Sequence, residues 1–369
     1  MYNLGAVGFG HWFNRLYAGL RDSGEVKVAK IAGVSSIDGK LKKMREMGIG
    51  EDAYYQIGMD GPIPDRFYDG LDIVHISDPN EYHAEQTMDS LRHGKITITE
   101  KTWGINKKEF DDVARFVEDN DLGNKAYLHL HYLQKQLTKG LDALLDKYTG
   151  EYGKVKSVSE SFFEVENEED TRRSNWLFSK KNGGLFMDWI HTFEIVISGA
   201  EATKAELKDF DLFVVNPRYS TEHPTGIAAK VSLAGKHFAN GATGIMRMAK
   251  GTTNGIKAAR FYFESGAYID LEYLNSETEF GSDRRGTWTL YDGGRKVTSG
   301  APRGPNTSEV FVNEILDMCH GRQAGLTVSD ARKLFAPQWK YQELVDRKEL
   351  NYPGDSVSTF LSKGFALDL

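Results

Sequence analysis

Three side chains in this chain have the chemistry to exchange protons with a substrate oxygen. Lys101 follows Glu100 at the end of the apolar stretch "KITITEK", and partial desolvation lowers the pKa of a lysine toward neutrality. Asp188 and His191 lie nearly one helical turn apart in "GGLFMDWIHTFEI", and an imidazole is a natural proton relay. We interpret Lys101, Asp188 and His191 as candidate catalytic residues. The alternatives are a surface ion pair between Lys101 and Glu100, and a purely structural role for Asp188 and His191.

A glycine-rich turn opens the chain in "LGAVGFGHWF". Gly8 would allow a tight turn, and Gly10 would let a pyrophosphate approach the main chain at the start of a helix. Phe13 stands where G-x-G-x-x-G has its third small residue, so we expect its ring to push the helix outward or to turn away from the strand. The residues predicted to bind a dinucleotide here are Gly8, Gly10, His11, Trp12 and Phe13. The alternative is a turn with a structural role only.

The end of the second predicted strand lacks the acid that usually holds the ribose of NAD. Ser35 and Ser36 occupy that place, and Lys40 follows closely. Hydroxyl and ammonium groups suit a 2′-phosphate, so this stretch favours NADP, with NAD possible. The alternative is that Ser36 caps a helix, the lysines are solvated and Asp38 holds the ribose.

The elements that would position these residues alternate between strand and helix through the first third of the chain. Leu4–Val7 reads as a buried strand, and helical spacing begins directly after Gly10. Residues 25–36 read as a strand, and 71–94 and 95–120 each read as strand, loop and helix. This order predicts a parallel sheet whose ligands bind beyond the carboxyl ends of the strands.

After Gly123 the pattern changes to short segments that alternate polar and apolar residues, with helices returning near the end. We therefore predict an α/β protein with two domains. Residues 1–124 would form a Rossmann-type dinucleotide-binding domain. Residues 125–369 would form a C-terminal α+β domain with a large open, mostly antiparallel sheet, used for substrate binding and oligomerisation.

The stretch "DIVHISDPNEYHAEQTMDSLRHGKITITEKTWG" resembles the Gfo/Idh/MocA oxidoreductases, the relatives of glucose–fructose oxidoreductase and inositol dehydrogenase. That family carries D-x-V-x-I-x-T-P-N-x-x-H and then G-K-H-V-x-x-E-K-P, and here Asp78 replaces the threonine and Thr102 the last proline. The stretch from Gly183 resembles the family's G-G-x-x-x-D-x-G-x-H, with His191 three residues after Asp188 instead of four. The resemblance implies further cofactor contacts at Ser77, Asp78, Pro79, Asn80, His83, Glu100 and Lys101. It also implies a catalytic lysine, acid and histidine, a sugar or cyclitol substrate, and a homodimer or homotetramer.

Other candidates for substrate binding lie after the first domain. His129 and His131 in "YLHLHYL" would share one face of a strand beside the substrate, or else form a packed polar pair. Their spacing could suit a metal, but no acidic or cysteine partner is identifiable in the sequence, so we predict none. Arg172 and Trp176 lie in a polar loop that leads toward Asp188, either as a rim over the substrate or as a solvated loop.

Composition excludes several classes of protein. A formal net charge of −7 argues against a nucleic-acid-binding protein, and no apolar run suggests a membrane span. The single cysteine, Cys319, and the absence of a signal-peptide pattern favour a cytoplasmic protein. The expected function is an NAD(P)-dependent dehydrogenase or reductase that acts on a CH–OH group of a sugar or polyol. The alternatives are a non-catalytic NAD(P)-binding regulator and a redox-neutral NAD-dependent glycosidase.

Overall fold

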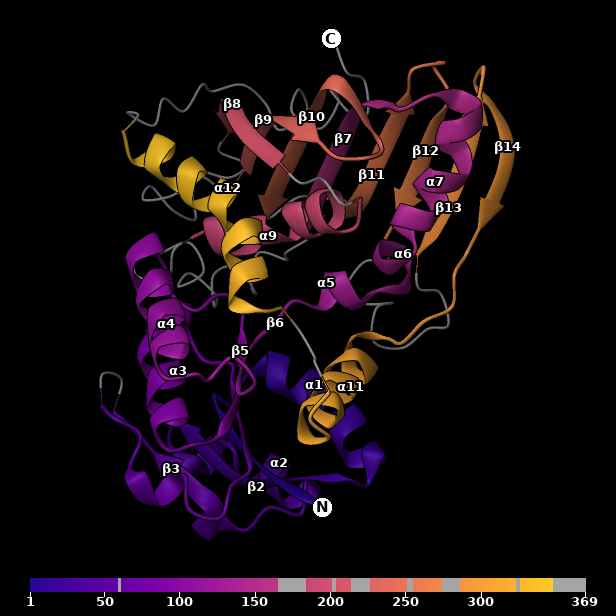
Figure 1. Ribbon diagram of the computed structural model, residues 1–369. Helices are drawn as coiled ribbons and strands as arrows, with labels where there is room; N and C mark the ends of the chain where they lie inside the picture. Colours follow the sequence, from indigo (N-terminus) through magenta and orange to yellow (C-terminus); the bar gives the residue numbers. More distant parts are fainter. Residues whose placement is uncertain are drawn as a thin grey trace. The chain divides into compact units, whose positions relative to one another are not determined.

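The computed structural model describes residues 1–58, 61–164, 184–200, 204–213, 226–250, 255–273, 286–322 and 326–347. The chain divides into two compact units (Figure 1). Unit 1 comprises Met1–His131 and Thr307–Ala331, and unit 2 comprises Tyr132–Asn306 and Arg332–Leu369.

Unit 1 is built on a six-stranded parallel sheet in the order β3-β2-β1-β4-β5-β6. Its strands are β1 (Tyr2–Val7), β2 (Val26–Gly33), β3 (Tyr54–Gln56), β4 (Ile73–Ile76), β5 (Ile96–Glu100) and β6 (Ala126–His129). Its α-helices are α1 (His11–Ser23), α2 (Leu41–Glu46), α3 (His83–Arg92), α4 (Lys107–Asp119) and α11 (Thr307–Cys319). Short 3-10 helices include η1 (Ile37–Gly39) and η4 (Asn80–Tyr82). This strand order is that of a Rossmann sheet, so the predicted fold of the N-terminal part is confirmed.

Apolar runs explain why these strands lie inside the unit. The side chains of Leu4, Ala6 and Val7 in β1 are fully buried, as expected for a central parallel strand covered on both faces. Figure 1 shows α1 beside α11 and α3 beside α4, the pairs that pack together. The strand register aligns Val7 with Ile76 of the neighbouring strand, so the carboxyl ends of the strands meet at one edge.

Unit 2 is built on an eight-stranded sheet in the order β14-β13-β12-β11-β7-β10-β9-β8. Its strands are β7 (Val155–Glu164), β8 (Lys204–Phe213), β9 (Gly226–Ala234), β10 (Phe238–Lys250), β11 (Ile256–Phe263), β12 (Tyr268–Glu272), β13 (Thr287–Asp292) and β14 (Arg295–Gly300). The pair β7–β10 is parallel, and the other neighbouring pairs of described strands are antiparallel. The prediction of a large, mostly antiparallel sheet is therefore confirmed.

Helices cover one face of this second sheet. They are α6 (Gln136–Lys139), α7 (Leu141–Tyr152), α9 (Phe186–Phe193), which continues into the π-helical turn η7 (Glu194–Ser198), and α12 (Val328–Arg347). Trp189 of α9 stacks on Tyr341 of α12 with ring centroids 5.1 Å apart, and Tyr148 of α7 lies 6.1 Å from the ring of Trp288 in β13. On the opposite face, Tyr268 stands between the rings of two neighbouring tyrosines.

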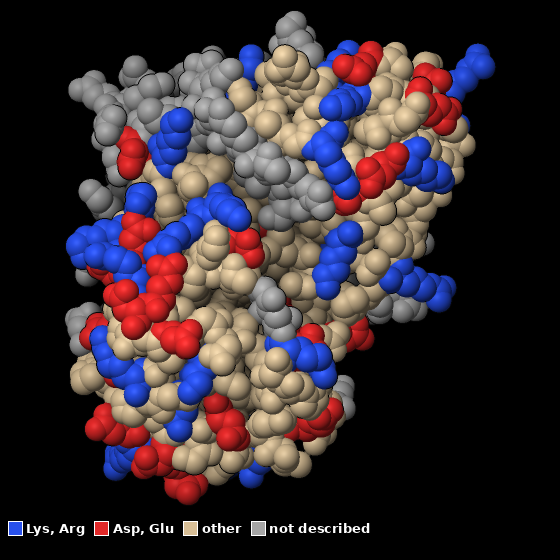
Figure 2. Space-filling model, in the orientation of Figure 1, with Lys and Arg blue, Asp and Glu red and all other residues tan. Residues whose placement is uncertain are grey.

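Sequence patterns missed some elements of the fold. The short strand β3 was not expected, because it has only three residues and all of them are exposed or half-exposed. The edge strand β14 was not expected, because its sequence "RKVTSG" is mostly polar. The expectation that His129 and His131 share a strand is wrong, because β6 ends at His129 and helix α5 (His131–Gln134) begins at His131. None of the described helices is long and apolar enough for a membrane crossing. On the face drawn in Figure 2, basic and acidic side chains are intermixed.

Candidate active site

The two glycines of the opening turn are required for different reasons. Gly8 has φ +89°, and a Cβ there would lie 2.6 Å from the main-chain nitrogen of Asp78 and 2.7 Å from the carbonyl carbon of Ser77. The turn after β1 therefore packs directly against the loop after β4. Among the described residues, chain neighbours aside, a Cβ on Gly10 would meet nothing within 4 Å, so the main chain at the N-terminus of α1 is open at this point. The backbone of His11 begins this helix, whose first turn contains no acidic residue.

Phe13 does not occupy that open space. Its side chain is fully buried, and its ring lies 5.9 Å from the ring of His75 in β4 and 5.8 Å from that of Phe9. The ring therefore faces the sheet instead of turning away from it. Phe13 supplies the packing between helix and strand that a small residue usually allows by close approach.

The residues after β2 form a capped turn beside the glycine turn. Ser35 and Ser36 are exposed, and the Ser36 hydroxyl accepts a hydrogen bond from the Asp38 amide at 3.3 Å. The same hydroxyl donates to the Asp38 carboxylate at 2.9 Å, so the capping role considered for Ser36 is present. The Lys40 ammonium donates to the Phe9 carbonyl at 3.3 Å, which brings a positive charge to the glycine turn.

The loop after β4 lies against the glycine turn. The Ser77 amide donates to the Val7 carbonyl at 2.8 Å, and the hydroxyl of the same serine lies 3.4 Å from the Gly8 carbonyl. Pro79 and Asn80 follow, and Asn80 begins η4. This loop therefore ends at the same edge of the sheet as the glycine turn.

His83 fastens this loop to the turn that carries Lys101. Its Nδ1 lies 2.9 Å from the carbonyl oxygen of Thr102, and its Nε2 lies 2.9 Å from the carbonyl oxygen of Asp78. The ring is buried, and burial lowers the pKa of His83 despite these two acceptors. The Lys101–Thr102 peptide bond is cis. His83 therefore links the loop after β4 to the residue that follows Lys101.

Asp78 brings a carboxyl group to a place where the resembled family has a hydroxyl. Its Oδ2 accepts a hydrogen bond from Gln86 at 2.6 Å, and its side chain is 8% exposed. Burial raises the pKa of Asp78 to about 7, because it outweighs the hydrogen bond from Gln86. This carboxyl therefore changes its charge near neutral pH.

Glu100 is the centre of a buried polar cluster at the carboxyl edge. Trp12 Nε1 donates to its Oε1 at 2.6 Å, and His75 Nε2 lies 3.3 Å from the same oxygen. Burial raises the pKa of Glu100, but the charge of His129 and the contacts with His75 and Trp12 outweigh it and hold the pKa below its usual range. An anionic Glu100 therefore precedes Lys101, whose side chain is partly exposed.

His129 and His131 join this cluster, together with an acid that sequence reasoning missed. Glu314 of α11 places its Oε2 2.5 Å from His129 Nδ1. The His131 ring lies 6.0 Å from the His129 ring and 5.5 Å from that of Trp12. The acidic partner of His129, which could not be identified in the sequence, is therefore Glu314. The one feature of the sequence that could have indicated this partner is that Glu314 occupies a buried position of a mostly apolar helix.

In unit 2, Asp188 is held by a buried lysine that sequence reasoning also missed. Lys250 at the end of β10 forms an ion pair with Asp188, and its ammonium lies 3.3 Å from a carboxylate oxygen of Glu164. Lys257 of β11 lies 3.6 Å from the other oxygen of Glu164 and donates to the Tyr132 hydroxyl at 2.7 Å. Both lysines occupy buried positions of strands, and this feature could have indicated that they pair with buried acids. His191 is buried on the same helix as Asp188.

The predicted site residues therefore fall into two groups, one in each unit. Unit 1 gathers the glycine turn, the loop of Asp78, the Glu100–Lys101 turn and the two histidines. Unit 2 carries Asp188 and His191. Arg172 and Trp176 lie outside the described residues, and the structure describes the backbone of His11 but not its side chain.

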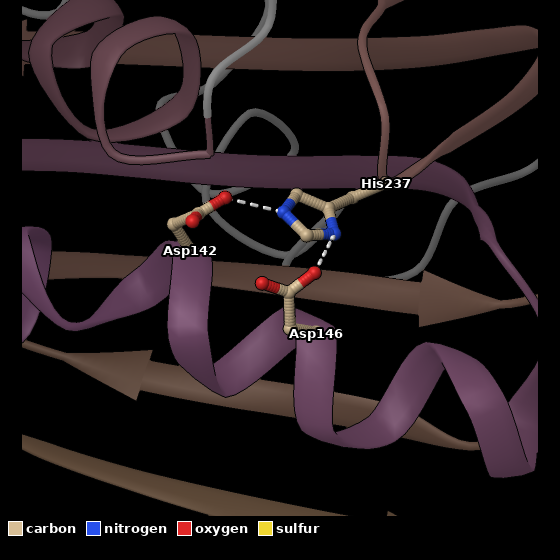
Figure 3. A group of neighbouring side chains, drawn as sticks. All are labelled: Asp142, Asp146 and His237. Carbon is tan, nitrogen blue, oxygen red and sulfur yellow. Dashed lines mark hydrogen bonds and ion pairs between the residues drawn. The ribbon is translucent and has the colours of Figure 1, made fainter.

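One further cluster in unit 2 has the composition of a metal site. Figure 3 shows Asp142 and Asp146, one turn apart on α7, directed at His237, and their ligand atoms lie within 4.8 Å of one another. His237 Nε2 lies 2.5 Å from Asp142. Lys236 donates to Asp142 at 2.9 Å and to Asp146 at 3.2 Å, so both carboxylates share one ammonium group. These contacts attach α7 to the loop between β9 and β10.

Comparisons with known proteins find likeness at the level of structure. No protein-family profile and no curated protein sequence matches the chain. The 3-ketoreductase KijD10 from Actinomadura kijaniata, solved with NADP and TDP-benzene, superposes with a TM-score of 0.72 at 13% identity, over 90% of this chain and 94% of that chain. The aldose–aldose oxidoreductase from Caulobacter crescentus, solved with glycerol, superposes with a TM-score of 0.71 at 17% identity, over 94% of this chain and 96% of that chain. The chain has the fold of these oxidoreductases. At such identities the likeness concerns the fold, which agrees with the fold implied by the sequence resemblance.

Proposed function

We propose that this protein is an NAD(P)-dependent oxidoreductase that transfers hydride between nicotinamide and a hydroxyl or carbonyl carbon of a sugar or cyclitol. The observation that carries the proposal is the open space at Gly10, in front of the N-terminus of α1 and next to the central strand of a Rossmann sheet. The sequence resemblance and the names of the two structural neighbours support the same reaction class.

The residues present fit a dinucleotide. The first turn of α1 offers main-chain N–H groups and no acidic side chain, which suits a pyrophosphate. Lys40 brings its ammonium to the turn, and the exposed Ser35 and Ser36 hydroxyls suit a 2′-phosphate. NADP is therefore the proposed cofactor and NAD the alternative, because the Asp38 carboxylate lies beside Ser36. KijD10, whose crystals contain NADP, supports this choice.

The bound nicotinamide would accept or supply the hydride, and the protein must handle the accompanying proton. Lys101 is the proposed hydrogen-bonding partner of the reacting oxygen, since it follows the carboxyl end of β5, where ligands of parallel sheets bind. Glu100, the residue before it, is held anionic by His129, His75 and Trp12. Asp188 and His191 are the proposed catalytic pair of unit 2, and His129 and His131 are proposed substrate contacts. Unit 1 is the proposed dinucleotide-binding domain, and unit 2 is the proposed substrate and oligomerisation domain of a cytoplasmic homodimer or homotetramer.

The proposal is tested by oxidation of NADPH and NADH at 340 nm with a panel of keto sugars and by reduction of NADP with the matching polyols. We expect turnover with at least one member, and we expect Lys101→Met to lower kcat by about 10²-fold or more while binding of NADPH changes little. Lys95→Met is the matched control, because Lys95 directly precedes β5 and its ammonium donates instead to the carbonyl of Leu71, which lies just before β4. Binding of NADPH without turnover of any sugar or polyol would instead indicate a regulator. Consumption of a glycoside without net change in NAD would indicate a redox-neutral glycosidase.

A further inference from the structure

The histidine of unit 2 has an acidic partner other than the one its sequence motif suggests. His191 Nδ1 lies 3.0 Å from Oε1 of Glu194, the first residue of the π-helical turn that follows α9. The side chains of His191 and Glu194 are 5% and 0% exposed. A carboxylate oxygen accepts only, so Nδ1 is the donor. This contact selects the Nδ1–H tautomer of the neutral ring and leaves Nε2 as the nitrogen that takes up a proton.

The motif acid is committed to a different cation. Asp188 forms an ion pair with the buried Lys250, which is itself 3.3 Å from Glu164. The negative charge of Asp188 is therefore compensated by an ammonium group. Glu194 is the acid at the imidazole nitrogen.

Aromatic side chains hold the imidazole plane. The Phe162 ring stacks on the His191 ring with centroids 5.3 Å apart, and the Tyr132 ring meets it edge-on at 5.0 Å. These contacts restrict rotation of the ring, so the direction of Nε2 is set by packing as well as by the carboxylate. Such support from a second layer of residues is what keeps catalytic groups in one geometry.

Glu160 is a second buried acid, close enough to Glu194 to feel its charge. Glu160 in β7 is fully buried, and neither of its carboxyl oxygens has a hydrogen-bond partner among the described residues. Burial and the charge of Glu194 raise the pKa of Glu160 well above its usual value. An unsatisfied buried carboxyl destabilises a fold. Such a destabilising group next to Glu194 is typical of a functional site, where a protein gives up some stability.

We propose that Glu194, and not Asp188, is the acid that positions His191, by accepting its Nδ1–H and directing Nε2 toward the substrate. The use of Nε2 rests on the proposed function, whereas the tautomer does not. Glu194 is a positioning residue because it acts through the imidazole. The proton that Nε2 takes from a substrate hydroxyl converts the ring to imidazolium, whose charge Glu194 then balances.

The tautomer is read directly by ¹⁵N NMR of the full-length protein labelled at its histidine rings, with the His191 signals assigned from a His191→Gln spectrum. We expect the unaltered protein to show His191 with a protonated Nδ1 and an unprotonated Nε2. In Glu194→Met the acceptor is absent, and the ring should shift toward the Nε2–H form. Glu194→Gln keeps an oxygen acceptor and should restore the Nδ1–H form, and this variant also serves if Glu194→Met does not fold. Asp188→Asn is the matched control and should leave the tautomer unchanged.

Kinetics then separate this proposal from the proposed function. With a substrate from the panel, Glu194→Met should lower kcat about 10- to 100-fold with a smaller change in KM, the range known for carboxylates that orient a metal-binding histidine. An Nε2–H ring in the unaltered protein, or a tautomer that follows Asp188→Asn and not Glu194→Met, would overturn the role of Glu194. The NMR result stands or falls without turnover, so absence of activity with every substrate would count against the proposed function alone.

Discussion

Substitution of the two turn glycines separates folding from cofactor binding. At Gly10, φ is −91° and ψ is −170°, an extended conformation that a β-branched residue adopts readily, and a new Cβ meets none of the described residues within 4 Å apart from its chain neighbours. Gly10→Val should therefore change the free energy of unfolding by less than about 1 kcal/mol. Gly8 differs, because φ is +89° and a new Cβ would lie 2.6 Å from the main chain of Asp78. Gly8→Ala should destabilise unit 1, with about 1–2 kcal/mol from the left-handed backbone alone.

The effect of Gly10→Val on the cofactor is large because the side chain would fill the space that a pyrophosphate needs. Hydrogen bonds to a charged group contribute about 1.5–3 kcal/mol each, so loss of two from the N-terminus of α1 amounts to about 3–6 kcal/mol. The Kd for NADPH should therefore rise by about 10²- to 10⁴-fold. Gly10→Ala, with a smaller side chain, should have a smaller effect in the same direction.

Two measurements on the same preparations decide the matter. Thermal unfolding reports whether each variant is folded, and titration with NADPH followed by nucleotide fluorescence reports the Kd. Folded Gly10→Val protein that binds NADPH as tightly as the unaltered protein would refute the reasoning, because the pyrophosphate would then lie elsewhere.

Three further predictions concern single side chains. Ser36→Asp should weaken binding of NADP and strengthen that of NAD by about 1–3 kcal/mol, as judged by titration with each nucleotide; tighter binding of NAD by the unaltered protein would mean that Ser36 is only a cap. Asp78, whose pKa rises from 3.8 to about 7 on folding, is protonated in the folded protein when the unfolded chain has already ionised, so its contribution to stability falls as the pH rises from 4 to 7. Asp78→Asn should therefore gain in urea unfolding midpoint relative to the unaltered protein over that pH range, and a difference independent of pH would contradict this. Glu160→Met should raise the free energy of unfolding at pH 7 by about 1–3 kcal/mol, because it removes a buried carboxyl without partners; a lower urea midpoint would show that this carboxyl stabilises the fold.

At the start of the chain, the local sequence pattern was enough to predict the secondary structure. The apolar run of β1, the two glycines and the helical spacing that begins at His11 are neighbours in sequence, and the strand, turn and helix were predictable from them. The alternating segments after Gly123 likewise predicted the second sheet, since a one-sided sheet repeats every two residues. Weak local signal explains the missed edge strand β14, whose residues are mostly exposed.

The partners of the candidate site residues were decided by tertiary structure. Glu314 reaches His129 because α11 returns to unit 1 from far along the chain, and Lys250 reaches Asp188 because β10 pairs with β7 beneath α9. Even Glu194, three residues from His191, could not be chosen over Asp188 from spacing, because both acids lie within one helical turn of the ring. Local periodicity places a side chain on a face of an element. The charge that it meets there depends on which distant strand or helix packs against that face.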